Sequence, residues 1–249
     1  MDCHCHIDEL EFPENAVLGA RKAAVRLMIS NSTGLESMKA NLSLQERFPE
    51  IKAAIGIFPT VAAEISENDF GEALFFLSEN LGNCIAVGEI GLDFYRAKTD
   101  SEKQKQVSAF REQVGLAVSS AKPVCVHSRN SILECIELLE KAGAESVLLH
   151  WFSGTNEELK RVASNNWMVS FGPAILRGKS AAALVKGAPL ESILLETDSP
   201  VKFDGKQALP EMVPLVARRV AEIKGLELGE VEAITQQNSL EFFAPKGMR

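Results

Sequence analysis

The feature that most constrains the fold is a regular alternation of short apolar runs and longer amphipathic segments, which continues through the 249 residues. Short apolar runs predict buried strands, and apolar residues at a three-to-four spacing predict the helices between them. Eight runs follow this pattern, at residues 2–7, 25–30, 52–57, 85–90, 124–127, 146–150, 168–171 and 193–197. Eight strand–helix units predict an α/β fold, a TIM (β/α)8 barrel in a single domain over residues 1–249. On this pattern alone, a doubly wound open sheet is the alternative.

The clearest of the intervening helices is predicted at residues 102–121, where apolar residues recur at the spacing of one helix face. Ser101, followed three residues later by Gln104, predicts a capping box at its start. Similar apolar stripes predict further helices at residues 132–139 and 213–223.

Charge and composition limit the classes of function. With 26 Lys and Arg against 34 Asp and Glu, the formal net charge is -8, which is the opposite of the basic field that most simple nucleic-acid binders carry. A nuclease is compatible with this charge if bound metal cations supply the local positive charge. The sequence shows no apolar stretch of ~18 residues, no signal peptide and no disulfide framework. We expect a cytoplasmic protein without a membrane segment, and nothing in the sequence predicts an obligate protein partner.

All four histidines of the chain and two acidic residues fall at or near the carboxyl ends of predicted strands. Active sites of α/β barrels form on that face, so these residues are expected to lie together. Taken alone, each histidine is compatible with a buried core residue and Asp198 with a turn, whereas Glu89 follows an apolar run and a buried carboxylate needs a partner. The six candidates are His4, His6, Glu89, His127, His150 and Asp198.

Within the first run, the alternation of side chains along a strand predicts which residues share a face. His4 and His6 are expected on one face together with Asp2, while Cys3 and Cys5 are expected to face the helices. A histidine face without cysteine disfavours a structural zinc site built from thiolates.

Mixed imidazole and carboxylate ligands suit divalent ions such as Zn, Mn, Fe or Mg. Six ligands exceed what one tetrahedral ion uses, so the simplest prediction is two divalent metal ions (Mg, Mn or Zn) about 3.5–4 Å apart. Glu89, between the two histidine pairs, is the predicted bridging ligand. Two such ions would activate a shared water and polarise a phosphoryl or carbonyl oxygen.

Three further residues are assigned from their place beside these ligands. Arg129, two residues after His127, is predicted to hold a phosphate oxygen, with a surface arginine as the alternative. Glu196 has the same strand phase as Asp198 and is predicted to lie deeper in the barrel. Trp151 is compatible either with stacking on a base or with packing. The predicted catalytic residues are Glu89, Asp198 and Arg129.

Five ordered segments together resemble the TatD family of metal-dependent deoxyribonucleases. They are Asp-Cys-His-Cys-His-Ile-Asp at 2–8, Gly-Glu-Ile-Gly-Leu-Asp at 88–93, Pro-Val-Cys-Val-His-Ser-Arg at 123–129, His-Trp-Phe-Ser-Gly at 150–154 and Leu-Glu-Thr-Asp-Ser-Pro at 195–200. The resemblance implies a TIM barrel with a two-metal site that hydrolyses DNA phosphodiesters. By position it also implies two metal sites that share one ligand. The first has His4, His6, Glu89 and Asp198, and the second has Glu89, His127 and His150.

The chain departs from the family pattern around this centre. The family commonly has a His-Pro-His-like segment after the third strand, whereas residues 56–60 read Gly-Ile-Phe-Pro-Thr, so Phe58 and Thr60 supply no imidazole there. Trp151 stands where the family usually has cysteine, and residues 201–210 lack its Asn-Glu-Pro segment. The predicted ligands are therefore intact while their surroundings differ.

From these features we expect a two-metal phosphodiesterase that acts on DNA as its substrate, cleaving from strand ends. One alternative is a hydrolase of carbonyl compounds, such as an amide, lactone or aminoacyl ester, on the same barrel. Glu89 occupies a position where several such barrels carry a modified lysine, which favours phosphoryl chemistry. The other alternative is a metal-binding barrel without catalytic activity.

Overall fold

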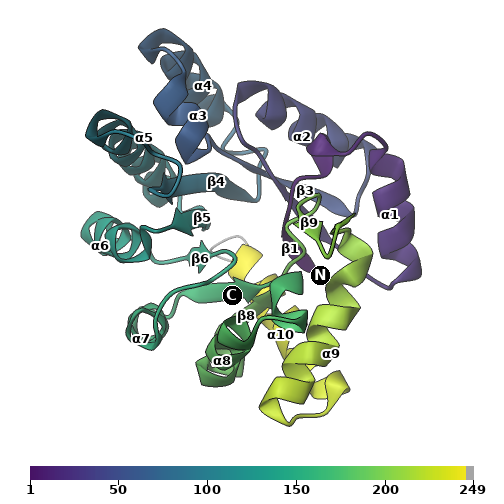
Figure 1. The fold of residues 1–249 in the computed structure, drawn as a ribbon. Helices are drawn as coiled ribbons and strands as arrows, with labels where there is room; N and C mark the ends of the chain where they lie inside the picture. Colours follow the sequence, from purple (N-terminus) through teal and green to yellow (C-terminus); the bar gives the residue numbers. More distant parts are fainter. Residues whose placement is uncertain (245–249) are drawn as a thin grey trace.

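Eight parallel strands form one sheet in which the spatial order of the strands is their order in the chain (Figure 1). The structure, a computed structural model, describes residues 1–244, so the last five residues of the predicted domain lie outside the described residues. The strands are β1 (Asp2–Cys5), β2 (Met28–Asn31), β3 (Ile51–Ile55), β4 (Ala86–Asp93), β5 (Val124–Arg129), β6 (Val147–Leu149), β7 (Met168–Phe171) and β8 (Ile193–Leu195). A doubly wound sheet would reverse its strand order at a switch point. The sequential order instead confirms the (β/α)8 barrel.

The segment that follows β8 closes the barrel against β1. The amide of Asp198 donates to the carbonyl of His4 (2.9 Å), and the amide of His6 donates to the carbonyl of Ser199 (2.6 Å). Asp2 adds a side-chain link, because its carboxylate accepts from both the amide and the hydroxyl of Thr197. Burial raises the pKa of Asp2 to about 7, although the hydrogen bonds from Thr197 act in the opposite direction.

Helices surround the strands on the outside (Figure 1). They are α1 (Pro13–Lys22), α2 (Leu35–Arg47), α3 (Pro59–Glu64), α4 (Glu67–Glu79), α5 (Asp100–Ser119), α6 (Ile132–Ala142), α7 (Asn156–Ser164), α8 (Lys179–Gly187), α9 (Val213–Lys224) and α10 (Leu228–Phe243). A short hairpin of β9 (Lys202–Phe203) and β10 (Lys206–Gln207) follows the eighth strand. Within residues 1–244, none of the helices combines the length and apolarity required to cross a lipid bilayer.

Helix α5 begins earlier than the predicted capping box. Thr99 is the N-cap, since its hydroxyl accepts from the amide of Glu102 and the Glu102 carboxylate accepts from the amide of Thr99. Ser101 and Gln104 are already inside the helix. Two capping-box patterns overlap here, and the acidic one adds a negative charge near the helix N-terminus, which the helix dipole favours.

The apolar core has two parts. The larger part joins the outer faces of the strands to the helices. A smaller cluster fills the inside of the barrel and consists of Cys3, Ile29, Ala54, Ala86, Cys125, Leu148 and Leu194 together with Phe242 and Phe243. The two phenylalanines come from the last turn of α10 (yellow in Figure 1), which places this turn against the interior of the barrel.

A bulge in β1 overturns part of the predicted alternation. Asp2 pairs with Met28 and Cys5 pairs with Ser30, so three steps along β1 lie opposite two steps along β2. An extra residue of this kind breaks the period of two. As a result Cys3 packs in the interior cluster, and the prediction that it faces the helices is wrong. Cys5 belongs to the outer part of the core, as expected.

Candidate metal centre

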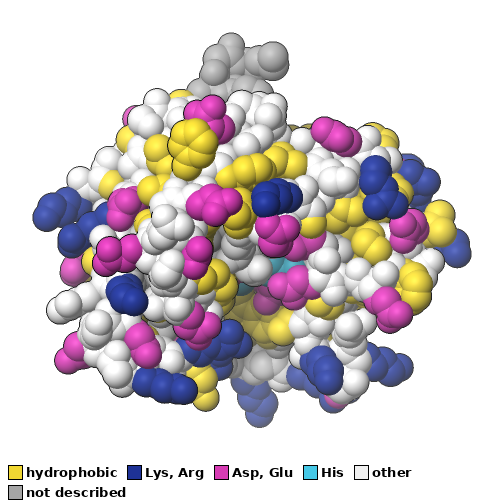
Figure 2. Space-filling model, turned by 90° about the horizontal axis from the view of Figure 1, so that it is seen from above, with side chains coloured by type: hydrophobic (Ala, Val, Ile, Leu, Met, Phe, Trp, Pro, Cys, Tyr) yellow, Lys and Arg dark blue, Asp and Glu magenta, His cyan; other side chains and the backbone are white. Residues whose placement is uncertain are grey.

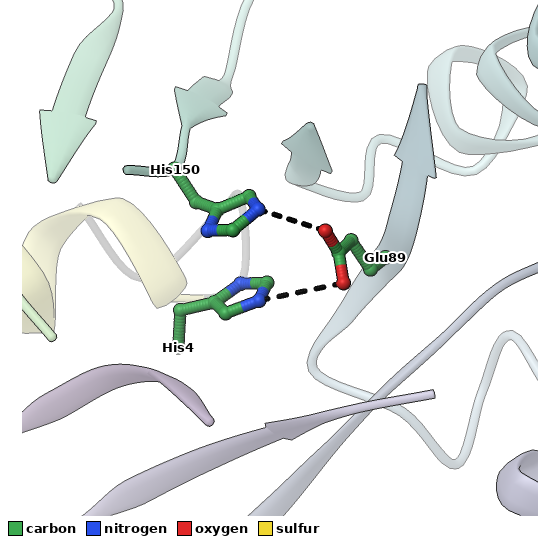
Figure 3. A group of neighbouring side chains, drawn as sticks. All are labelled: His4, Glu89 and His150. Atoms are coloured by element: carbon green, nitrogen blue, oxygen red, sulfur yellow. Dashed lines mark ion pairs between the residues drawn. The ribbon is translucent and has the colours of Figure 1, made fainter. Parts of the chain in front are cut away.

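The structure brings all six predicted ligand residues together at the carboxyl end of the barrel. Three of them, His4, Glu89 and His150, are drawn in Figure 3, where both imidazoles point toward the carboxylate. They come from β1, from β4 and from the residue after β6. His6 follows β1, His127 lies on β5 and Asp198 follows β8. The site is therefore built from five separate strand ends.

Glu89 is at the middle of the group. Its Oε1 lies 2.8 Å from Nδ1 of His127 and 2.7 Å from Nε2 of His150. Its Oε2 lies 3.6 Å from Nε2 of His4 and 3.3 Å from Nε2 of His6. Burial alone would raise the pKa of Glu89, but the imidazoles hold it well below its ordinary value. The carboxylate is therefore ionised, as a metal ligand must be.

Asp198 lies beside His4 and His6, on the Oε2 side of Glu89. Its Oδ1 lies 3.6 Å from Nε2 of His4 and 3.4 Å from Nε2 of His6. The backbone at Asp198 has φ 51°, a conformation that costs energy for a residue other than glycine. Two backbone hydrogen bonds hold it there. The amide of Asp198 donates to the carbonyl of His4, and the amide of Val201 donates to the carbonyl of Asp198 (2.8 Å). Burial opposes ionisation of Asp198, yet the contact with His6 lowers its pKa.

Two of the imidazoles are oriented by groups outside the ligand set. Nδ1 of His6 donates to the carbonyl of Asn31 (2.8 Å), which leaves Nε2 facing the carboxylates of Glu89 and Asp198. Nε2 of His127 lies 3.2 Å from Oδ2 of Asp93, so Nδ1 faces Glu89. Burial alone would lower the pKa of His127, but Asp93 and Glu89 at its two nitrogens raise it.

The group fits divalent metal ions on its own geometry. Both ring nitrogens of His4 are buried without a hydrogen-bond partner, and its ring stacks on that of His150 with centroids 3.8 Å apart. An unsatisfied buried polar atom costs about 1–3 kcal/mol, and a metal ion would supply the missing partner. Among the described residues, two sets have ligand atoms within 4.8 Å of one another, namely His4, Glu89 and His150, and His4, His6 and Asp198. Nitrogen and oxygen donors of this kind suit Zn, Mn or Mg.

Two contributors were missed from the sequence. Asp93 is the last residue of β4, four positions after Glu89, and the period of two places both on one face, so this signal was available. Asn31 contributes its backbone carbonyl. Every residue type has this group, so the sequence could not indicate it.

Glu196 lies deeper in the barrel than the six candidate metal ligands, as predicted. Its carboxylate accepts hydrogen bonds from neighbouring residues of the barrel. Oε2 accepts from the hydroxyl of Ser170 (2.5 Å) and lies 3.7 Å from Nδ1 of His150. Oε1 accepts from the amide of Trp151 (2.9 Å). This bond holds Trp151 at φ 43°, again a left-handed conformation in a residue with a side chain.

A cavity of about 690 Å³ opens above the ligands and includes Arg129 in its wall. Figure 2 shows a hollow in the surface with histidine at its floor and carboxylates beside it. The guanidinium of Arg129 lies 3.9 Å from the ring centre of Tyr95. Phe58 also lines the cavity, with its ring edge-on to His127 at 4.7 Å between centroids. Trp151 is in the wall as well, whereas the adjacent Phe152 is buried in the core.

Asp93 gives a first testable consequence. Because it orients His127, Asp93→Asn is expected to weaken the binding of Mn²⁺ by roughly 10–100-fold. Titration calorimetry measures the dissociation constant, and the melting temperature without metal shows whether the fold is retained. Asp100→Asn makes the same change at an almost fully exposed position and should leave the affinity unchanged. If the two variants bound Mn²⁺ with equal affinity, Asp93 would not orient His127 for metal binding.

Known proteins resemble this chain in sequence and in fold. The family described as TatD related DNase matches residues 1–244. The human deoxyribonuclease TATDN3 is 32% identical over 257 residues, which cover 98% of this chain and 94% of that protein. The uncharacterized metal-dependent hydrolase YabD of Bacillus subtilis is 29% identical, over 97% of this chain and 98% of that protein. The crystal structure of YJJV, a TatD homolog from Escherichia coli, superposes with a TM-score of 0.89 at 27% identity over 98% of both chains. With a family match from residue 1 to residue 244, the chain belongs to the TatD related DNases and is a hydrolase of that family.

Proposed function

We propose that this protein is a metal-dependent phosphodiesterase that hydrolyses DNA from its strand ends with two divalent ions. The observation that carries the proposal is the position of Glu89, whose two oxygens face two different pairs of imidazoles. A carboxylate that binds two ions through separate oxygens needs this arrangement. The family match and the names of the relatives support the choice of a phosphodiester substrate.

In this proposal His4, His6 and Asp198 hold one ion, His127 and His150 hold the other, and Glu89 is shared. When bound, such ions polarise a phosphoryl oxygen and lower the pKa of a water molecule. The identity of the ions, Mg, Mn or Zn, is open because all three accept nitrogen and oxygen ligands.

The protein's own groups bind the substrate and handle the proton. Asp198 is ionised and 17% of its side chain is exposed, so a lone pair is free to accept the proton of the attacking water. Arg129, exposed at the mouth of the cavity, is placed to hold a phosphate oxygen with two parallel N–H groups. The four histidines fix the position of Glu89 so that little reorganisation is needed during the reaction.

We also propose that the protein works in the cytoplasm. Its five cysteines, at positions 3, 5, 84, 125 and 135, are all buried and unpaired. Free thiols in this number are typical of a reducing compartment.

The proposal is tested with end-labelled single-stranded DNA incubated with Mg²⁺, Mn²⁺, Zn²⁺ or EDTA. We expect release of mononucleotides that requires a divalent ion and stops with EDTA. A phosphomonoester and a lactone are assayed in parallel under the same conditions. Turnover of the lactone alone would assign the site to carbonyl chemistry, and metal binding without turnover of any substrate would make this a non-catalytic barrel.

A further inference from the structure

The cavity above the metal centre has walls of two kinds. Phe58, Val61, Trp151 and Val201 contribute apolar surface. Among the described residues that line the cavity, the lysine and arginine side chains are limited to Arg96 and Arg129, which follow β4 and end β5. A ligand in this cavity can therefore contact both apolar side chains and a small number of positive charges.

The two arginines are not equally free. Arg96 lies close to Asp93, with Nε 3.8 Å from Oδ2 and its amide donating to Oδ1 (2.9 Å). The guanidinium of Arg129 instead rests on the ring of Tyr95, which is 62% exposed. Stacking of this kind holds the guanidinium flat without neutralising its charge. Arg129 is therefore the available phosphate-binding group of the wall.

The lining offers a long polyanion few cationic side chains beyond the proposed metal ions. Of its four acidic residues, Glu89 and Asp198 would be offset by those ions, which leaves Glu9 and Asp93 beside two arginines. Each phosphate that a protein neutralises along a strand requires a cationic side chain. The volume of about 690 Å³ lies within the range of roughly 300–1,000 Å³ in which proteins enclose small ligands. The cavity accommodates a strand end, with too few cations for an extended backbone.

A longer strand would have an alternative contact surface in the β9–β10 hairpin, which follows Val201 in the chain. Lys202 and Lys206 are exposed there, but neither lines the cavity. At the turn of the same hairpin, Asp204 pairs with Arg177 (2.7 Å), so the guanidinium of Arg177 already has a carboxylate partner.

Resting on the proposed phosphodiesterase activity, we propose that the preferred substrates are single-stranded oligonucleotides of only a few nucleotides. One base packs against the apolar wall at Phe58 and Trp151, and one phosphate binds Arg129. Further nucleotides extend into solvent and add no binding energy.

The kinetic test compares a trinucleotide with a twenty-nucleotide strand of oligothymidylate, both in Mn²⁺. We expect kcat/KM values within about threefold of each other, with a slope of roughly −0.7 in log kcat/KM against log salt for one phosphate contact. A tenfold or larger preference for the long strand, with a steeper salt slope, would overturn the proposal. Failure to hydrolyse either strand would instead count against the proposed function, and the binding test below would still decide the substrate class.

Binding is measured in EDTA, where no turnover takes place. The chain has two tryptophans, Trp151 in the cavity wall and Trp167 in the core. Quenching of fluorescence that is absent in Trp151→Phe reports occupancy of the cavity. We expect equal dissociation constants for the two strands, and binding of the long strand that is ten times tighter would contradict the proposal.

Substitutions distinguish substrate binding in the cavity from substrate binding on the β9–β10 hairpin. Phe58→Ala and Arg129→Gln are each expected to raise KM by about tenfold on both strand lengths, since loss of one stacking or phosphate contact is of this size. Phe75→Ala removes an aromatic side chain that is 66% exposed on α4 and should change nothing. The double variant Lys202→Ala, Lys206→Ala should also be neutral. A selective loss of activity on the long strand in that variant would overturn the proposal.

Discussion

Glu89→Gln is expected to lower divalent-dependent kcat/KM by at least about 10³-fold, which corresponds to roughly 4 kcal/mol of lost transition-state stabilisation. The amide keeps the shape of the side chain but lacks the negative charge. Only its oxygen has a lone pair to offer a metal ion, because the other end is an NH2 group. In the native site each oxygen of Glu89 faces its own pair of imidazoles. The substitution therefore weakens both halves of the centre at once.

The measurement is initial-rate hydrolysis of single-stranded DNA at saturating Mn²⁺, with metal content determined on the same sample. Glu79→Gln makes the identical chemical change at an exposed position on α4 and should retain full activity. Circular dichroism shows whether the two variants are equally folded. If Glu89→Gln kept full metal-dependent activity, the shared-ligand role of Glu89 would be wrong.

The second large effect is on stability and concerns the floor of the barrel. Phe242→Ala is expected to lower the free energy of unfolding by about 3–5 kcal/mol, because a large buried side chain is removed from a closed interior. Phe242 is 4% exposed, packs in the interior cluster and stacks edge-on with Phe243 at 4.8 Å between centroids. Neighbouring side chains have little freedom to fill the space because they are fixed on strands.

Chemical denaturation of the metal-free protein measures this loss, which should leave the m value unchanged. Leu240→Ala, on the same helix but 52% exposed, is the matched control and should change stability by less than about 0.5 kcal/mol. Similar losses in both variants would show that the filling of the barrel does not determine the effect.

The strands and the clustering of the six candidate residues were predictable because each depends on a local signal. Short apolar runs locate strands, and the carboxyl end of a strand in a barrel locates the site. His127 and His150 could therefore be placed without knowledge of any contact. Glu196 was placed at the right depth for the same reason, because strand phase relates it to Asp198.

The features that could not be predicted depend on non-local geometry. The bulge in β1 arises from pairing with β2, and it sends Cys3 into the barrel against the local alternation. The orientation of His6 depends on a backbone carbonyl at Asn31, which any residue type would provide. The start of α5 was misplaced for a different reason. Two overlapping capping patterns were present, and only the structure shows that Thr99 is used.

The closure of the barrel also determines the order in which the centre is assembled. Asp2 and Thr197 are 195 residues apart in the chain, and their hydrogen bonds connect the same two segments that supply His4 and Asp198. During synthesis the first histidines leave the ribosome long before their carboxylate partner exists. A nascent chain that ends before Asp198 cannot form the complete ligand set. Under the proposed function, tight metal binding would therefore follow completion of the barrel.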